Sequence, residues 1–424
     1  MSNQCVVIEQ SMPLHGEAQL AGAKNAVLVI IASLILAPGK SRLTNVPVSD
    51  DVFNMITLLK SLGAQVVFDE KRQILDVDTS TINSFTVSPD IMKKMRASIL
   101  VMGPLLARFH KAHVATPGGC VLGARPIDYH LRAFTKMGAN IEMSNEYIKA
   151  NAPNLHAERL ILEYPSVGAT ENILMAAVLT SGKTTIVNAA IEPEVLDLIE
   201  ILTKMGAQIK IAPPATIEIE GVKELRAVEH PIILDRLEAG SLMLAAAITG
   251  GSISLPTAPA WSMETFIEKL CDMGHTIVVE PNGIGLTFTA TTNPRAVSIK
   301  TMPYPGFPTD LQAPMLAIQC LADGVSTIHE TVFDNRLVHV RELQKMGAQI
   351  TVDGHVATVK GTDTLYGAQV IAPDIRASAA LVIAGLAAQG QTIMTGIHHL
   401  HRGYQDFDKK LAALGGKIYV REIE

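Results

Sequence analysis

Met205-Gly206-Ala207-Gln208-Ile209 is the stretch that decides the fold, because the same phrase returns along the whole chain. The glycines of its six copies are Gly63, Gly138, Gly206, Gly274, Gly347 and Gly415. Successive glycines are 75, 68, 68, 73 and 68 residues apart. Six units of about seventy residues each therefore fill the 424-residue chain.

Each copy indicates the end of an amphipathic helix and the start of a strand. Before Gly206, the apolar residues Val195, Leu198, Leu202 and Met205 recur at helical spacing. The glycine then supplies the left-handed residue that ends many helices. The alternating run that follows is typical of a strand.

A second helix, apolar almost all round, is expected upstream in each unit and is followed by a strand. The six predicted helices are 26–37, 97–107, 169–180, 241–249, 311–322 and 377–388. A helix that is apolar on every side must be wrapped by protein. The pattern therefore predicts an α/β fold with these six helices inside.

The chain ends suggest how the units group. The sixth unit stops soon after residues 418–420, while the strand-like segment 5–20 has no helix of its own. We expect this segment to complete the last unit. Two sets of three units then give one domain near 21–229 and a second of 230–424 plus 1–20, with a cleft between them.

Composition excludes several functional classes. The chain is 48% hydrophobic but only 4% aromatic, which predicts an aliphatic core. A formal charge of −6 and a single Trp261 argue against nucleic acid as a partner. Cys5, Cys120, Cys271 and Cys320 lie far apart without a CxxC pair, which indicates a reducing compartment and no structural zinc.

The apolar run 26–37 is too short to cross a bilayer, which takes about 20 residues. Lys24 is the only cation before this run, so it does not have the charged start of a signal peptide. We therefore expect a cytoplasmic protein that does not bind membranes.

Charged side chains gather where the wrapped helices begin. The cations in question are Lys24, Arg96, Arg125, Arg336, Arg376 and Arg402. Helix N-termini attract anions through their dipoles and free N–H groups, so this set favours a polyanionic small molecule as ligand. A cation at such a position opposes the dipole, and Lys24 and Arg96 are therefore hard to explain as purely structural residues.

Some of these residues have structural alternatives. Asp310 and Asp374 are good helix N-caps, and Arg402 could be an ordinary surface arginine. His130 and the cluster His398, His399 and His401 show no spacing that completes a metal site, so we expect no metal.

The loop Thr116–Pro126 places a thiol, Cys120, five residues before Arg125. Two glycines allow close approach to a ligand, and nearby positive charge lowers the pKa of a thiol. The alternative is a strained surface turn with an incidental cysteine.

With these residues considered together, the sequence resembles the enolpyruvyl transferases almost from end to end. The motifs are Gly22–Ala26, Arg96–Ser98, Pro117–Cys120, Gly123–Pro126, Ser166–Thr170, Phe307–Asp310, Asn335–Arg336, Asp374–Ser378 and Arg402–Tyr404. The resemblance implies two inside-out α/β domains of three repeated units each, with the active site in the interdomain cleft. It also implies transfer of the enolpyruvyl group of phosphoenolpyruvate to the 3′-hydroxyl of UDP-N-acetylglucosamine, with release of phosphate and without a cofactor.

The resemblance also assigns roles to residues. Cys120 would protonate phosphoenolpyruvate and form a covalent adduct with it, Asp310 would act as base, and Asp374 would assist elimination. Lys24 and Arg402 complete the implied catalytic set. The implied phosphoenolpyruvate ligands are Lys24, Asn25, Arg125, Arg376 and Arg402, with Arg336 in support. The implied nucleotide-sugar ligands are Asn25, Arg96, Arg125, Pro126, Ile127, Asp128, Tyr129, Ser166, Val167, Gly168, Asp310 and Val332. The antibiotic fosfomycin would alkylate Cys120.

Five residues depart from the family pattern, and two of them, Ile127 and Tyr129, vary the run on the uridine side. Tyr164 and Pro165 stand where many relatives have a basic and an aliphatic residue, and Leu100 stands where a tryptophan is common. We expect weaker nucleotide affinity with an intact catalytic set. The rival hypotheses are a shikimate-pathway enolpyruvyl transferase, which has no equivalent of the Pro-Gly-Gly-Cys loop, a cysteine hydrolase, and a noncatalytic repeat scaffold.

Overall fold

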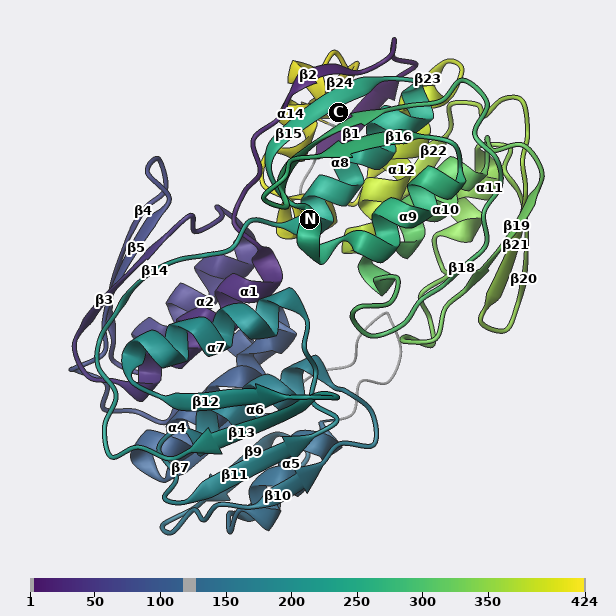
Figure 1. The fold of residues 1–424 in the computed structure, drawn as a ribbon. Helices are drawn as coiled ribbons and strands as arrows, with labels where there is room; N and C mark the ends of the chain where they lie inside the picture. The colour runs from purple at the N-terminus through teal and green to yellow at the C-terminus, as the bar shows by residue number, and fades with distance from the viewer. Residues whose placement is uncertain (1–3, 117–126, 423–424) are drawn as a thin grey trace. The chain divides into compact units, whose positions relative to one another are not determined.

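A computed structural model of the chain describes residues 4–116 and 127–422, which form two compact units (Figure 1). We call residues 22–116 and 127–233 the N-terminal unit, and residues 4–21 and 234–422 the C-terminal unit. The expected boundary near residue 229 falls within the strand Glu229–Pro231, which pairs inside the N-terminal unit. The two compact units meet in the sequence after Ile233.

The N-terminal unit contains three four-stranded sheets of one topology. Their strand orders are β14-β3-β5-β4, β6-β7-β9-β8 and β10-β11-β13-β12. The strands are β3 (Lys40–Thr44), β4 (Gln65–Asp69), β5 (Ile74–Asp78), β6 (Thr86–Val87), β7 (Lys111–Ala115), β8 (Asn140–Met143), β9 (Tyr147–Asn151), β10 (Arg159–Ile161), β11 (Lys183–Val187), β12 (Gln208–Ala212), β13 (Thr216–Glu220) and β14 (Glu229–Pro231). In each sheet the first two strands are parallel and the other pairs antiparallel.

The C-terminal unit repeats this plan three more times. Its strand orders are β16-β17-β15-β2, β18-β19-β21-β20 and β22-β23-β1-β24. The strands are β1 (Gln4–Glu9), β2 (His15–Glu17), β15 (Ser252–Pro259), β16 (Thr276–Val279), β17 (Ile284–Thr289), β18 (Ile299–Lys300), β19 (Val325–His329), β20 (Gln349–Asp353), β21 (Val356–Lys360), β22 (Gln369–Ile371), β23 (Gln391–Thr395) and β24 (Ile418–Glu422). The α/β class expected from the repeat is therefore confirmed.

The N-terminal segment serves two sheets rather than one. β1 lies between β23 and β24, with Val6 opposite both Met394 and Val420. β2 instead pairs in parallel with β15, with Gly16 opposite Ile253, and so belongs to the sheet of the fourth unit. We expected the whole segment to complete the last unit, but its two strands divide between two sheets.

The helices are of two kinds. Those of the N-terminal unit are α1 (Lys24–Ser33), η1 (Leu34–Leu36), α2 (Asp50–Ser61), α3 (Pro89–Lys94), η2 (Arg96–Val101), α4 (Met102–Phe109), α5 (Asp128–Lys136), α6 (Val167–Ala177) and α7 (Pro193–Met205). Those of the C-terminal unit are α8 (Arg236–Thr249), η3 (Ala260–Ser262), α9 (Glu264–Asp272), η4 (Thr309–Leu311), α10 (Gln312–Gln319), α11 (Val340–Lys345), α12 (Ile375–Ala387), α13 (His398–Gly403) and α14 (Phe407–Ala413).

The wrapped helices form the core of each unit. Residues 26–33 of α1, 169–177 of α6 and 376–386 of α12 are all buried. In the C-terminal unit α8, α10 and α12 pack against one another. The amphipathic helices end as predicted, because the six repeat glycines all have φ between +93° and +110°, which side chains disfavour.

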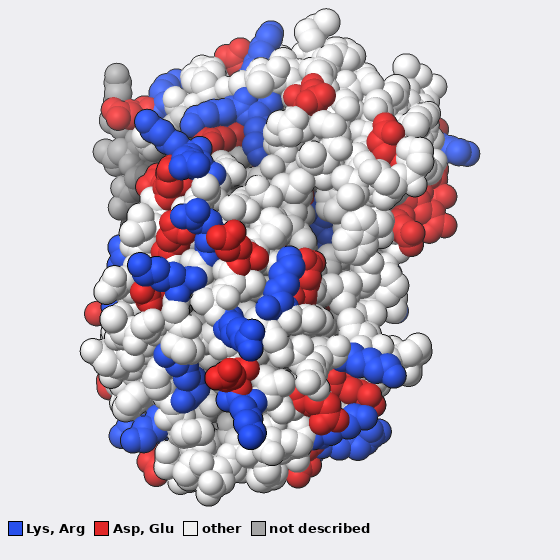
Figure 2. Space-filling view, turned by 60° about the vertical axis from the view of Figure 1, so that its left-hand side comes forward, with Lys and Arg blue, Asp and Glu red and all other residues white. Residues whose placement is uncertain are grey.

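The surface carries side chains of both charges, as the composition does. On the face shown in Figure 2, acidic and basic side chains are interspersed rather than gathered into one basic field. Within the described ranges, no helix is long and apolar enough to span a membrane.

Candidate functional site

Asp310 lies between two arginines of the C-terminal unit. Its Oδ1 accepts a hydrogen bond of 2.7 Å from Nη2 of Arg336, and its Oδ2 accepts one of 2.8 Å from Nη2 of Arg376. The carboxylate comes from η4 and Arg376 from the start of α12. Both guanidinium groups are buried, with side-chain exposures of 3% and 4%, while Asp310 is 22% exposed. The acid therefore has a fixed direction and some access to solvent.

Arg376 is held in its charged form. Burial lowers the pKa of this guanidinium, but attraction to Asp310, Tyr404 and Asp235 outweighs burial and raises the pKa above its ordinary value. Its central carbon lies 5.2 Å from the ring centroid of Tyr404, whose hydroxyl is 3.0 Å from Oγ of Ser241. Nη1 of Arg376 is buried without a hydrogen-bond partner among the described residues. This N–H group can donate a hydrogen bond to an oxygen of an anionic ligand.

The two acidic residues that could have been N-caps differ. Asp374 caps α12, since its Oδ1 accepts hydrogen bonds from the backbone N–H groups of Arg376 and Ala377, at 2.8 and 3.0 Å. Asp310 caps neither η4 nor α10. The structural alternative therefore explains Asp374 in part and does not explain Asp310.

Helix α13 packs closely against the start of α12 and brings Arg402 to it. Arg402 is next to Gly403, the last residue of α13, and a Cβ atom on Gly403 would lie 2.1 Å from Cγ2 of Ile375. Only glycine fits at this crossing. The partly buried Arg402 is thereby placed beside the helix that carries Asp374 and Arg376.

In the N-terminal unit, Lys24 begins α1 and forms an ion pair with Asp51, with Nζ and Oδ2 3.0 Å apart. Asp51 is buried and offsets part of the cost of placing a cation at a helix N-terminus. The next residue, Asn25, is exposed.

Ser166, Val167 and Gly168 form the start of α6. Oγ of Ser166 accepts a hydrogen bond of 3.4 Å from the N–H of Ala169, so this serine is the N-cap. A Cβ atom on Gly168 would lie 3.4 Å from Cε1 of His130. The loop therefore presents backbone N–H groups at a helix N-terminus, where phosphates bind well.

Asp128 and Tyr129 begin α5, directly after the partly buried Ile127. Oδ2 of Asp128 pairs with Arg132 at 2.7 Å, and the guanidinium carbon of Arg132 lies 4.8 Å from the ring centroid of Tyr129. Oδ1 of Asp128 is buried and has no hydrogen-bond partner within the described ranges, so it can accept a bond from a ligand.

The other predicted residues lie in different parts of the chain. Val332 follows β19, and its N–H donates to Glu330. Arg96 is the first residue of η2. Cys120, Arg125 and Pro126 lie outside the described residues. Of the residues that depart from the family pattern, Leu100 is buried and Tyr164 is exposed.

The histidines singled out in the sequence lie in different surroundings. Nδ1 of the buried His130 lies 3.0 Å from Nδ2 of Asn172, so this ring is a hydrogen-bonded part of the core. Burial, with His398 and Arg402 nearby, lowers the pKa of His399 to about 4. Within the described parts of the chain, no group of three or more His, Cys, Asp or Glu side chains could hold a metal ion.

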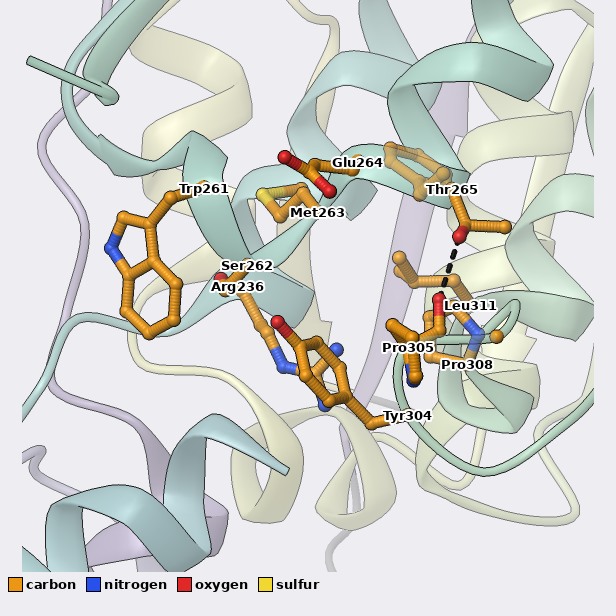
Figure 3. A pocket seen from close by; sticks show the side chains of 12 residues that line it. Arg236, Trp261, Ser262, Met263, Glu264, Thr265, Tyr304, Pro305, Pro308 and Leu311 are labelled. Carbon is orange, nitrogen blue, oxygen red and sulfur yellow. Dashed lines mark hydrogen bonds between the residues drawn. The ribbon is translucent and has the colours of Figure 1, made fainter. Parts of the chain in front are cut away.

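Sequence reasoning missed a charged pair at the start of the fourth wrapped helix, because it placed that start at residue 241. Asp235 caps α8 by accepting from the N–H groups of Leu237 and Glu238, and Arg236 follows it. Arg236 lines a pocket, where its guanidinium carbon is 5.6 Å from the ring centroid of Tyr304 (Figure 3). The signal was a charged pair at a helix start, as in the sixth unit.

A second missed group is a set of buried carboxylates in the N-terminal unit. Burial, together with the charges of Glu194 and Glu192, raises the pKa of Glu171 well above its usual range. Glu171 lies on α6, whose start carries Ser166. No pattern in the sequence distinguishes this buried glutamate from an exposed one.

Comparisons with known proteins point to one family. The profile described as EPSP synthase (3-phosphoshikimate 1-carboxyvinyltransferase) matches residues 8–411. UDP-N-acetylglucosamine 1-carboxyvinyltransferase 1 of Caldanaerobacter subterraneus subsp. tengcongensis is 48% identical over 413 residues, which are 97% of this chain and 98% of the relative. The UDP-N-acetylglucosamine 1-carboxyvinyltransferase of Geobacter metallireducens is 46% identical over the same shares of the two chains.

Two solved structures share the fold. The enolpyruvyl transferase NikO from Streptomyces tendae superposes with a TM-score of 0.90 at 24% identity, covering 99% of each chain. An EPSP synthase from Acinetobacter baumannii superposes with a TM-score of 0.78 at 17% identity, again covering 99% of each chain.

Proposed function

The chain belongs to the EPSP synthase family of enolpyruvyl transferases, and on this premise we propose that it transfers the enolpyruvyl group of phosphoenolpyruvate to the 3′-hydroxyl of UDP-N-acetylglucosamine. Phosphate is the second product. This reaction is the first committed step of peptidoglycan synthesis, so the chain is a transferase of cell-wall formation. The observation that carries the proposal is 48% identity over 97% of the chain to a relative named for this reaction.

The chemistry is addition followed by elimination. In the addition, the thiol of Cys120 donates a proton to the methylene carbon of phosphoenolpyruvate. Asp310 removes the proton of the 3′-hydroxyl. The hydroxyl oxygen then bonds to the carbon of phosphoenolpyruvate that lies next to the methylene carbon. In the elimination, a proton leaves the methyl group, the bond to the phosphate oxygen breaks, and the double bond returns.

The geometry of Asp310 supports its role as the base. Two buried arginines orient the carboxylate, and its partial exposure leaves room for a sugar hydroxyl. A base must lie within hydrogen-bond reach of the proton that it removes. For Asp374, the capping bonds both use Oδ1, so we assign proton movement during elimination to Oδ2.

The anionic substrates need cations and helix N-termini. We assign phosphoenolpyruvate to Lys24, Asn25, Arg125, Arg376 and Arg402. Buried Nη1 of Arg376 supports this assignment because it has a proton to donate and no partner among the described residues. Arg336 supports the site indirectly by orienting Asp310.

The nucleotide sugar is assigned to several helix starts and to two groups of the C-terminal unit. These ligands are Asn25, Arg96, Arg125, Pro126, Ile127, Asp128, Tyr129, Ser166, Val167, Gly168, Asp310 and Val332. The N–H groups at the start of α6 can donate hydrogen bonds to the diphosphate. Oδ1 of Asp128 can accept a hydrogen bond from a donor group of the uridine. The assigned residues come from both units.

One assay tests the proposal directly. The protein is mixed with UDP-N-acetylglucosamine and phosphoenolpyruvate, and phosphate release is followed. No release, or equal activity with shikimate 3-phosphate, would refute the assignment and favour a scaffold or the shikimate-type reaction. A cysteine hydrolase would release no phosphate from this pair of substrates. We propose the cytoplasm as the location of the reaction.

A further inference from the structure

We propose that Glu330, which the mechanism above does not use, is a positioning residue that fixes Asp310 and Val332 relative to each other. The inference rests on the proposed function, because Asp310 and Val332 are the two groups of the C-terminal unit assigned to the sugar. Glu330 acts through these residues and does not touch the substrates.

The side chain of Glu330 is buried and has four hydrogen-bond donors. Oε1 accepts bonds from the hydroxyl of Thr301 at 3.0 Å and from the N–H groups of Val332 and Phe333 at 2.8 and 3.1 Å. Oε2 accepts a bond of 2.9 Å from the hydroxyl of Thr309. The residue is 1% exposed. A buried carboxylate is expensive unless its oxygens are satisfied, and this one joins three separate segments of the chain.

The hydrogen bond from Thr309 to Glu330 fixes the backbone that carries the proposed base. Thr309 is the first residue of η4, and Asp310 is the second. Arg336 and Arg376 orient the carboxylate of Asp310, whereas the bond from Thr309 to Glu330 orients the turn beneath it. The direction of the Asp310 carboxylate therefore depends on contacts of its side chain and on contacts of its backbone.

Another hydrogen bond holds the segment that precedes this turn. The hydroxyl of Thr265, on α9, donates a hydrogen bond of 2.6 Å to the carbonyl of Pro305, as the dashed line in Figure 3 shows. Pro305 and Pro308 line the pocket in that view. The segment before Asp310 is thus fixed to α9 and to Glu330, so a shift of the Glu330 carboxylate acts on a short, restrained turn.

The hydrogen bonds from Val332 and Phe333 to Glu330 fix the proposed sugar contact. The N–H groups of Val332 and Phe333 both point at Oε1 of Glu330, which sets the peptide plane between these two residues. That plane directs the carbonyl of Val332, a residue that we assign to the sugar. Glu330 thereby sets the distance between the base and the sugar contact.

Steady-state kinetics of Glu330→Ala test the inference. We expect kcat to fall about 100-fold, because a misplacement of about 1 Å has effects of that size. We also expect KM for UDP-N-acetylglucosamine to rise about tenfold, while KM for phosphoenolpyruvate changes little, because the ligands of the latter are elsewhere. Glu330→Gln should recover most of kcat, since its carbonyl can accept from both N–H groups and its amide can donate to Thr309.

Two further variants keep the test valid if Glu330→Ala folds poorly. Thr309→Val removes only the hydrogen bond between Glu330 and the turn that carries the base. It should lower kcat and raise KM for the sugar less than Glu330→Ala does. Glu342→Ala is the matched control, since Glu342 accepts a backbone N–H from Ile371 in the same unit but lies outside the site. It should lower the melting temperature and leave kcat unchanged.

The inference is overturned if Glu330→Ala or Thr309→Val keeps wild-type kcat. It is also overturned if Glu330→Ala behaves like Glu342→Ala, with lower stability and unchanged kinetics, because a purely structural role predicts that result. Wild-type protein that releases no phosphate would instead refute the proposed function.

Discussion

Asp310 and Arg376 are 66 residues apart in sequence, yet Nη2 of the arginine lies 2.8 Å from Oδ2 of the acid. The two residues begin neighbouring wrapped helices of the C-terminal unit, because η4 leads into α10 and α10 packs against α12. Repetition of one unit therefore places the same position, a helix start, side by side in space. The proposed base and its partner are a product of that repetition.

Arg376→Lys is expected to lower kcat about 100-fold, the usual effect of losing one oriented donor in an active site. Lysine keeps the charge, but its donors all sit on one nitrogen and not on a planar fork, so it cannot hold them at the two positions that the guanidinium reaches. Phosphate release at saturating substrates measures the change. Arg341→Lys, at an exposed arginine of α11, is the control and should behave as wild type. Equal activity of the two variants would contradict the role of Arg376.

Asp51→Asn is expected to raise KM for phosphoenolpyruvate about tenfold, because Lys24 would lose the ion pair that positions its ammonium. The free energy of unfolding should also fall by about 2 to 3 kcal/mol, since Asp51 is buried and removing one charge of such a pair is costly. Initial rates and urea denaturation provide the two measurements. The neighbouring Asp50 is exposed, so Asp50→Asn should change neither quantity.

Glu171→Gln is expected to make stability less dependent on pH. Burial, with Glu194 and Glu192 nearby, raises the pKa of Glu171 above its ordinary value of 4.5. Above that pH the unfolded chain loses this proton before the folded protein does, so wild-type stability falls as pH rises toward the raised pKa. Glutamine does not titrate and should remove this part of the fall.

Melting temperatures measured from mildly acidic to mildly alkaline pH check this prediction. The control is Glu200→Gln, an exposed residue of α7, which should follow the wild-type curve. A Glu171→Gln curve parallel to wild type would show that Glu171 does not cause the fall.

Fosfomycin is expected to add its mass to the protein at Cys120 only. Among the other cysteines, Cys5 and Cys320 are buried, and burial raises the pKa of Cys320 to about 12. Cys271 is exposed, but partial burial and the charges of Asp272 and Glu268 raise its pKa. Thiolates react and thiols do not, so none of these three should compete. Intact-mass spectrometry should show the adduct in wild type and in Cys271→Ser, and an adduct that survives in Cys120→Ser would refute the assignment.

Much of the fold could be predicted because its signals are local. Gly206 and its five equivalents end helices with positive φ, as the sequence suggested, and the helices that were apolar all round are the buried ones. The strands at the edges of the units could not be placed in this way. Gly16 and His230 belong to short strands whose partners, Ile253 and Leu43, are far away in sequence, and short strands carry little pattern of their own.

The site shows the same limit. The resemblance identified Asp310, Arg336 and Arg376, but only the structure shows that the two arginines bind opposite oxygens of one carboxylate. Glu330 is similar, since nothing in its sequence neighbourhood separates a buried carboxylate with four donors from an exposed one. Arg236 was missed because its helix starts with charged residues that interrupt the apolar run.

The sequence by itself determined the six repeats, the wrapped helices, the family and the residues proposed for catalysis, because spacing and residue type are local properties of the chain. Tertiary structure alone decided which of these residues meet. Asp310 joins Arg376, Lys24 joins Asp51, and Glu330 joins Thr309. These pairs depend on how helices pack and loops return, and such long-range contacts leave no periodic trace in the order of the amino acids.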